Sequence, residues 1–389
     1  MTETAPRPQA RPAAPAARVP DAPPQGAPLP GAPLPRERGP LSAAVLRVLR
    51  GGAAPAVAVA GADPLGEDLQ LALYLAYEPH YRALEGVADE REWDPAVLAL
   101  RRPMEQAFLE ALRAAVPDGD DVTAALEPLL VEPVDGQGVS HRLMREGTWE
   151  LMREYLVHRS PYQLKESDPQ AWLIPRLEGQ AKASLVAVAY DEFGGGRGER
   201  VHARLFADLM EGAGLDSSYG HYLDLVPAAT LATVNVMSLF GLHRSLRGAA
   251  AGNFAVIEIT SPPGARRMAR ALERLGAQER CVRFFTEHIE ADAVHEQVMR
   301  RDVLGDLLDR EPGLAADVAF GIRATVWLDE RWEEQVLAAW DDGRSSLRGP
   351  LAPAGPVATD RDATGDGATT TGATGAGATG PDAARPSAG

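Results

Sequence analysis

Cysteine is almost absent from the 389-residue sequence, which contains only Cys281. A single thiol excludes an internal disulfide and a cysteine-ligated metal site, so any metal site must be built from histidines and carboxylates. No run of about 18 apolar residues is free of charge, which excludes a membrane-spanning helix. The start of the sequence, Met1–Thr4, lacks the positively charged start and the apolar run of a signal peptide. We therefore expect a cytoplasmic protein without a membrane partner.

Basic residues are too few to balance the acidic ones. The sequence has 39 Lys and Arg against 55 Asp and Glu, a formal net charge of −16. A nucleic-acid surface needs Lys and Arg to neutralise phosphates, and an anionic membrane attracts basic segments, so both partners are excluded. The expected partner is a small-molecule substrate, and a homodimer is left open.

Aromatic residues are missing from both ends of the chain. Residues 1–40 contain 12 prolines and no aromatic residue, and residues 341–389 are rich in Gly, Ala, Thr, Pro and Asp. Such segments cannot bury enough apolar surface to offset the entropy of ordering them, so both are expected to be disordered tails. The remaining residues, about 300 from 41 to 340, are enough for one large folded unit.

Strand patterns are also lacking, because neither alternating apolar residues nor a hairpin signal of the Asn-Gly type is found. Apolar residues instead recur at helical spacing, and Pro262–Pro263 are expected to end a long apolar helix. The predicted fold class is all-α, a helical bundle. The main predicted helices cover residues 67–84, 96–116, 122–130, 140–158, 171–193, 199–211, 228–259, 264–275, 279–308 and 314–340.

Two histidines and an aspartate stand at metal-binding spacing in one predicted helix. His288, Asp292 and His295 occupy positions i, i+4 and i+7, which lie within about 60° of one another on a helix face. Two imidazoles and one carboxylate suit iron or manganese. The competing interpretation is a solvated polar face, which Glu287 and Glu290 make credible.

Other candidate ligands stand in unusual surroundings. Glu258 lies in an apolar run, where a carboxylate is costly unless it is paired or metal-bound. His202 lies between Val201 and the apolar pair Leu205-Phe206, which favours an inward-facing side chain. An ordinary hydrogen-bonded core histidine would fit there as well. Glu192 precedes the glycine run 194–196, which must bend the chain if Glu192 and His202 share a site. Glu199 is a competing candidate for the carboxylate ligand, because Glu199-x-x-His202 has the spacing used in carboxylate-bridged di-iron bundles.

Taken in order along the chain, these residues resemble a known family. The segment Tyr190-Asp191-Glu192-Phe193-Gly194-Gly195-Gly196-Arg197, followed by His202, Glu258 and His288-x3-Asp292-x2-His295, is similar to the haem-oxygenase-like di-iron oxidases and oxygenases, also described as the iron-containing redox enzyme family. The resemblance covers roughly residues 150–340. It implies a haem-oxygenase-like fold whose metal ligands are Glu192, His202, Glu258, His288, Asp292 and His295, with Glu166 as a further carboxylate.

The family resemblance also implies a function. Two non-haem iron ions would activate O2 as co-substrate to oxidise a small organic substrate, by N-oxygenation or by oxidative C–C or C–N cleavage, and no catalytic residue beyond the metal ligands is needed. The alternatives are a mononuclear iron oxidase and a non-catalytic metal- or haem-binding helical protein, for which His243 would be the haem candidate. The expected organisation is accessory helices over 41–150 and a catalytic domain over 151–340.

Overall fold

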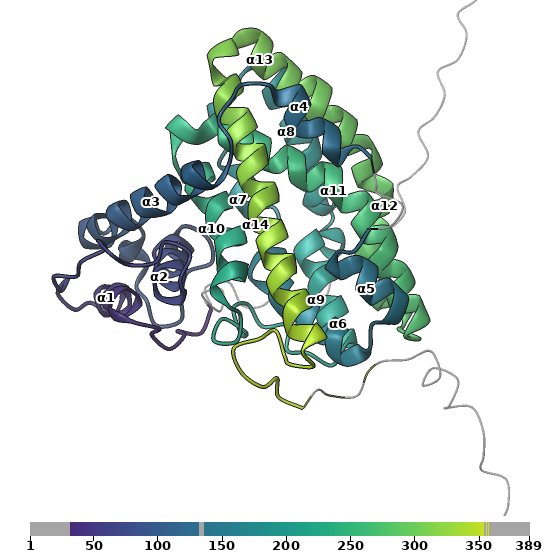
Figure 1. Cartoon of the computed structure of the whole chain (residues 1–389), viewed down its shortest axis with the longest axis horizontal. Helices are drawn as coiled ribbons and strands as arrows, with labels where there is room; N and C mark the ends of the chain where they lie inside the picture. The colour runs from purple at the N-terminus through teal and green to yellow at the C-terminus, as the bar shows by residue number, and fades with distance from the viewer. Residues whose placement is uncertain (1–31, 132–135, 354, 356, 358–389) are drawn as a thin grey trace, which may run out of the picture.

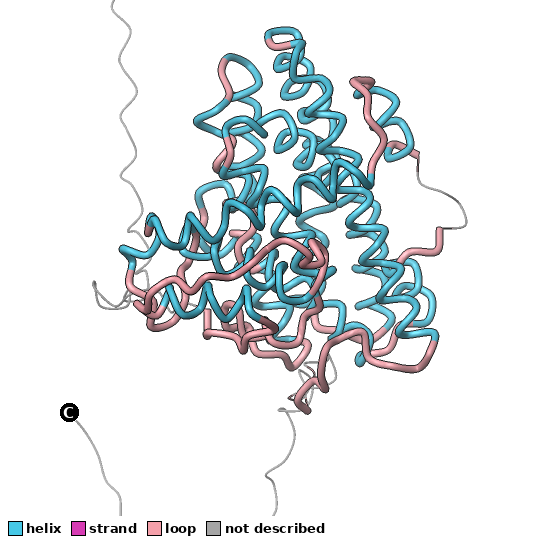
Figure 2. Tube along the Cα trace, turned by 60° about the vertical axis from the view of Figure 1, so that its left-hand side comes forward, coloured by secondary structure: helices cyan, strands magenta, loops and turns pink. Residues whose placement is uncertain are grey.

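The computed structural model describes residues 32–131, 136–353, 355 and 357. This part of the chain is built from helices joined by loops, without a β-strand, and an isolated bridge pairs Ala32 with Leu84 (Figure 2). The all-α fold class predicted from the sequence is confirmed. The α-helices, labelled in Figure 1, are α1 (Pro40–Leu49), α2 (Glu67–Tyr77), α3 (Pro95–Ala115), α4 (Val122–Leu126), α5 (Val139–Glu146), α6 (Trp149–Gln163), α7 (Asp168–Ala171), α8 (Gly179–Glu192), α9 (His202–Gly212), α10 (Ala228–Leu242), α11 (Arg247–Arg274), α12 (Glu279–Gln297), α13 (Asp306–Arg310) and α14 (Ala315–Asp341).

Helix α11 is the central element of the bundle, and it packs against both α12 and α14. Two glycines allow the close approach of α11 and α14. A Cβ atom at Gly321 would lie 2.2 Å from the carbonyl oxygen of Ala249, and one at Gly252 would lie 2.3 Å from that of Val318. Because real Cβ atoms do not approach backbone atoms this closely, only glycine fits at these two crossing points.

Helices α1, α2 and α3 lie together at one side of the bundle (Figure 1). Helix α2 is buried over nearly its whole length, from Leu69 to Tyr77, because it packs against α1, α3 and α10. Its apolar residues are therefore not confined to one face, as is typical of an internal helix. The accessory helices expected over residues 41–150 thus share an apolar core with the rest of the chain.

Parts of the two expected tails lie in the structure. Residues 1–31 and 358–389 are outside the described residues, but Ala32 is fully buried and the Arg38 side chain donates to Glu67. At the other end, Ser346 and Leu347 are buried. A few side chains on each flanking segment, outside the expected folded range of 41–340, therefore find partners on the bundle that composition alone does not reveal.

The helices over residues 228–275 differ from the prediction in two ways. The apolar stretch from residue 228 to 259 is divided near His243, whose backbone is extended, and Arg176 donates to the carbonyl oxygens of Gly241 and Leu242 that end α10. Pro262 and Pro263 do not end a helix but lie inside α11. Buried residues on both sides of the prolines hold the two halves of α11 in one apolar interface, which overrides the local preference of proline. They are Val256, Ile259, Ala265, Met268, Ala269 and Leu272.

Among the helices of the described residues, none combines the length and the apolar character needed to cross a lipid bilayer.

Candidate metal centre

Glu166 lies immediately beyond the end of α6, where the helix stops at Gln163. Its side chain is only 5% exposed. The Gln163 amide, oriented with its NH2 group toward Glu166, donates to both carboxylate oxygens at 2.8 and 2.9 Å. Burial raises the pKa of Glu166, while His288 acts in the opposite direction. A buried carboxylate held in this way is well placed to accept a cation.

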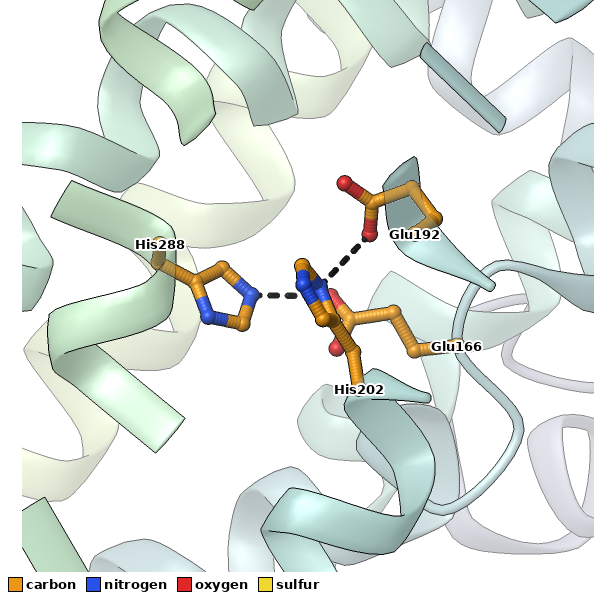
Figure 3. A group of neighbouring side chains, drawn as sticks. All are labelled: Glu166, Glu192, His202 and His288. Carbon is orange, nitrogen blue, oxygen red and sulfur yellow. Dashed lines mark ion pairs between the residues drawn. The ribbon is translucent and has the colours of Figure 1, made fainter. Parts of the chain in front are cut away.

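Glu192 and His202 come together across the glycine run. Glu192 is the last residue of α8 and His202 is the first of α9. Gly194, Gly195 and Gly196 between them all have positive φ, with values of 74°, 61° and 79°. This left-handed backbone reverses the chain, and glycine adopts it without steric cost. The Oε2 atom of Glu192 consequently lies 2.9 Å from Nδ1 of His202 (Figure 3).

The remaining candidates come from the two long helices α11 and α12. Glu258 of α11 is 3% exposed, and its Oε2 atom lies 3.1 Å from Nδ1 of His295 in α12. The same His295 nitrogen is 3.6 Å from Oε1 of Glu192. Two turns earlier in α12, Nε2 of His288 lies 3.7 Å from Oε1 of Glu166. The His202 and His288 rings face each other with centroids 4.2 Å apart.

These side chains form two adjoining groups in which possible ligand atoms lie within 4.8 Å of one another. The first group consists of Glu166, Glu192, His202 and His288, which Figure 3 shows converging on one point, and the second of Glu192, Glu258 and His295. All six residues are buried. Glu192 belongs to both groups, because its two oxygens face different histidines. The structure therefore brings together six of the seven residues singled out from the sequence.

The seventh residue is Asp292, which lies in α12 between His288 and His295. Its side chain is outside the described residues, so its role as a ligand stays a prediction. The rival Glu199 is exposed in the short helix that precedes α9 and does not join either group. Within the part of the chain that the structure describes, the carboxylates beside His202 are therefore those of Glu166 and Glu192, and not that of Glu199.

The histidines are oriented by groups outside the cluster. Nδ1–H of His288 donates to the carbonyl oxygen of Phe284 at 2.7 Å, which turns Nε2 toward Glu166. His295 presents Nδ1 to the carboxylates, and its Nε2 lies 3.1 Å from Oδ2 of Asp191. Such outer partners fix the ring orientation and the tautomer of histidines that bind metals.

Asp191 and Gln163 were not recognised as functional in the sequence. Asp191 directly precedes Glu192, and its side chain is 54% exposed. Its contact with His295 joins residues 104 positions apart, and no local pattern predicts such a pairing. Gln163 is the last residue of α6 and stands three positions before Glu166, so closeness in the sequence was the signal available for this contact.

An internal cavity opens beside the first group. Its volume is about 400 Å³, and Glu166 and His288 contribute to its wall. This volume falls within the range of small-ligand sites in proteins.

Two comparisons relate these residues to known proteins. Residues 153–330 match the profile of a family described as iron-containing redox enzyme. A stretch of 201 residues is 25% identical to a nitrosourea synthase from Streptomyces achromogenes subsp. streptozoticus, and it covers 50% of this chain. The chain covers 42% of that relative, which is less than half of its length. All six clustered side chains lie within the segment that matches the family.

Proposed function

Because residues 153–330 belong to the iron-containing redox enzyme family, we propose that this chain is a non-haem di-iron oxidase or oxygenase that uses O2 to oxidise a small organic molecule. The observation that carries the proposal is the pair of buried groups that share Glu192. A carboxylate with one oxygen facing each group is suited to bridge two metal ions, as carboxylates do in di-iron helical bundles.

The donor set fits two ferrous ions. Glu166, Glu192 and Glu258 place three carboxylates in a buried region, and each lies within 3.7 Å of an imidazole nitrogen. Buried negative charges of this density are costly unless cations neutralise them. Carboxylate oxygens and imidazole nitrogens are the ligands that iron binds in helical bundles. The residues present therefore match the cofactor that the family implies.

We assign the ligands to two positions. Glu166, His202 and His288 would hold one ion, Glu258 and His295 would hold the other with Asp292, and Glu192 would bridge them. Two ferrous ions, once bound there, would supply the electrons that reduce O2. The chain's own side chains hold the ions, fix the imidazole rings and enclose the site. The cavity beside Glu166 and His288 would receive the substrate.

The reaction class is proposed from the relative. Its name, nitrosourea synthase, indicates chemistry at nitrogen, so N-oxygenation is the first reaction to test in this chain. Oxidative C–C or C–N cleavage is the alternative outcome. A haem-binding role has less support, because Nε2 of His243 lies 3.0 Å from Oε1 of Glu105 and neither residue belongs to the buried cluster.

Iron stoichiometry tests the proposal. The full chain, loaded anaerobically with ferrous iron and desalted, should retain about two iron ions, and exposure to O2 should produce a transient visible absorption. His295→Ala should retain about one, whereas His221→Ala, at a partly exposed histidine outside the cluster, should still retain two. One iron in the wild type would support the mononuclear alternative, and unchanged stoichiometry in His295→Ala would overturn the ligand assignment.

A further inference from the structure

A series of aromatic side chains extends from the α6 side of the metal centre to the surface beside α3. Its outer member is Trp93, which is 58% exposed and directly precedes the N-cap residue of α3. The Trp93 ring lies against the His80 ring with centroids 4.7 Å apart, and the Trp172 ring makes an edge contact with His80 at 6.3 Å. The two indoles are therefore connected through one imidazole.

Hydrogen bonds fix the His80 ring that contacts both indoles. A guanidinium N–H of Arg101 donates to Nε2 of His80 at 2.8 Å, so the ring proton is on Nδ1, which lies 3.2 Å from Oε1 of Glu92. The charge of Arg101 is balanced by Glu105, whose Oε1 atom lies 3.2 Å from the guanidinium Nε. Burial lowers the pKa of His80 and keeps the ring neutral at neutral pH. A neutral imidazole does not repel a positive charge that moves between the two indoles, as imidazolium would.

The inner member of the series is Tyr162, which lies on α6 four positions before Glu166. Tyr162 is buried, and it lines the cavity beside the metal centre. Burial, followed by the three candidate carboxylate ligands, raises the pKa of Tyr162. Because these carboxylates belong to both groups of candidate ligands, Tyr162 lies close to both proposed metal positions.

The short helix α7 joins Tyr162 to Trp172. The side-chain amide of Gln170 in α7 donates to the Tyr162 hydroxyl at 3.1 Å. Trp172 is the C-cap residue of the same helix. Because Gln170 and Trp172 are two positions apart, their Cα atoms are separated by at most about 7 Å. The gaps between successive members of the series are therefore short, as one-electron transfer between aromatic rings requires.

Tyrosine and tryptophan give up one electron more readily than other aromatic side chains. We refer to Tyr162, Trp172, His80 and Trp93 as the aromatic relay. In the proposed function, O2 is reduced at a buried centre beside a cavity that is lined by oxidisable side chains, Tyr162 and Met237 among them. We propose that the aromatic relay carries oxidising equivalents from this centre to Trp93 when O2 reacts before a substrate is bound. The inference rests on the proposed function, which supplies the oxidising equivalents.

Each transfer moves one electron inward along the aromatic relay. Tyr162 gives one electron to the centre after O2 has oxidised it, and recovers an electron from Trp172, which in turn takes one from Trp93. The phenolic proton of Tyr162 leaves and returns with the electron, so Tyr162 and Trp172 end unchanged. Trp93 finally lacks one electron and releases its indole proton to solvent. A thiol in solution then gives one hydrogen atom to the Trp93 radical and restores it at the surface, away from the cavity.

Photo-oxidation of the iron-free chain tests the path itself. A tris(bipyridine)ruthenium photo-oxidant with an irreversible quencher oxidises exposed tryptophan in a laser flash, and transient absorption distinguishes tryptophan from tyrosine radicals. Every sample carries Tyr190→Phe, because Tyr190 is 58% exposed and would be oxidised directly. A tryptophan radical should form and decay as a tyrosine radical appears, since the potentials of the two side chains allow transfer in either direction.

Substitutions assign this transfer to the aromatic relay. The tyrosine radical should be lost in Tyr162→Phe, in Trp172→Phe and in Trp93→Phe, the last of which changes an exposed side chain and should not disturb folding. The control Trp327→Phe, at a partly exposed indole of α14 outside the relay, should behave as its parent does. Circular dichroism and thermal unfolding confirm that each variant is folded.

Reaction of the iron-loaded chain with O2 tests the use of the path. Without substrate or thiol, and with catalase present, peptide mass spectrometry should find oxygen added to Trp93 and little added to Trp327. Trp172→Phe leaves Trp93 exposed to solvent but interrupts the relay, so oxidation of Trp93 should be lost. Oxidation by species that diffuse through solvent would instead be unchanged in Trp172→Phe.

The outcomes separate this inference from the proposed function. Photochemical transfer that depends on Trp93, Trp172 and Tyr162 supports the aromatic relay, even if the chain takes up no iron and the oxidase proposal fails. No tyrosine radical in the parent, or one that persists in folded Tyr162→Phe or Trp172→Phe, would overturn the inference even if two irons are bound. An iron-loaded chain in which Trp93 is not oxidised, or is oxidised equally in Trp172→Phe, would overturn it as well.

Discussion

The ammonium group of Lys165 lies 2.8 Å from Oε2 of Glu78, and both side chains are at most 1% exposed. Glu78 follows α2, whereas Lys165 directly precedes the candidate ligand Glu166. The Tyr219 hydroxyl donates to the other Glu78 oxygen. Because this buried pair joins the accessory helices to the segment that carries Glu166, we propose that residues 41–150 extend the catalytic bundle rather than form a separate domain.

Removal of one partner should show how strongly this pair is needed. Lys165→Met leaves the Glu78 carboxylate buried without its cation, and we expect a loss of about 3–5 kcal/mol in the free energy of unfolding. The control Arg204→Met breaks a largely exposed ion pair with Asp208 and should cost at most about 1 kcal/mol. Urea unfolding measures both values, and similar losses in the two variants would contradict this interpretation.

A buried histidine should make the stability depend on pH. Burial, with a smaller effect of Arg159, lowers the pKa of His158 from 6.5 to about 3. The ring is suited to the neutral form, since Nε2–H can donate to Ser346 Oγ at 2.9 Å while the Trp332 indole N–H donates to Nδ1. The folded state thus resists protonation that the unfolded state accepts below pH 6.5.

The sign of this effect follows from the depressed pKa. Stability from this group is fully present above pH 6.5 and is lost as the pH falls, by about 2 kcal/mol between pH 7 and pH 5. His158→Gln should be less stable at pH 7 but should lose about 2 kcal/mol less over this interval. Unfolding by urea at both pH values checks the difference, and an identical pH dependence in the two proteins would show that His158 does not contribute.

Substitutions at two helix glycines should have opposite effects. Gly321→Ala places a Cβ atom 2.2 Å from the backbone of Ala249, so α11 and α14 must separate at a cost of about 1–3 kcal/mol. Gly264→Ala, inside α11, meets no atom within 4 Å and should stabilise the helix by about 0.5–1 kcal/mol. Thermal unfolding distinguishes them, and a neutral Gly321→Ala would contradict the close helix contact.

The exposed Asp191 should affect iron binding through His295. Its Oδ2 atom lies 3.1 Å from Nε2 of His295, and partners of this kind change metal affinity about 10- to 100-fold when they are lost. Asp191→Asn should therefore weaken retention of one ferrous ion by this factor and leave the other in place. Glu199→Gln, nearby and exposed, serves as the control. Competition with a chelator measures retention, and equal behaviour of the two variants would exclude a positioning role for Asp191.

Local spacing predicted part of the site. His288 and His295 share a helix face, as their spacing predicted. Nε2 of His288 and Nδ1 of His295 both face carboxylates of the cluster. The glycine run 194–196 was expected to bend the chain between Glu192 and His202, and its positive φ angles do so. These features could be predicted from the sequence because helix periodicity and glycine conformation are local properties.

Long-range contacts were beyond local reasoning. Only the family resemblance predicted Glu166 as a metal ligand, because nothing in its immediate sequence shows that it lies beside His288, 122 residues later. The contact of Asp191 with His295 and the stacking of Arg159 on Trp332 likewise depend on how helices pack. Pro262 and Pro263 show the converse case, in which a strong local signal is overridden by burial on both sides of a helix.

The positions of the metal ions test the central claim most directly. A crystal structure of the chain loaded anaerobically with ferrous iron, with anomalous data collected at the iron absorption edge, would locate them. We predict two iron peaks on either side of the Glu192 carboxylate, one contacted by Glu166, His202 and His288 and the other by Glu258 and His295. A single peak, or iron bound away from these side chains, would contradict the account.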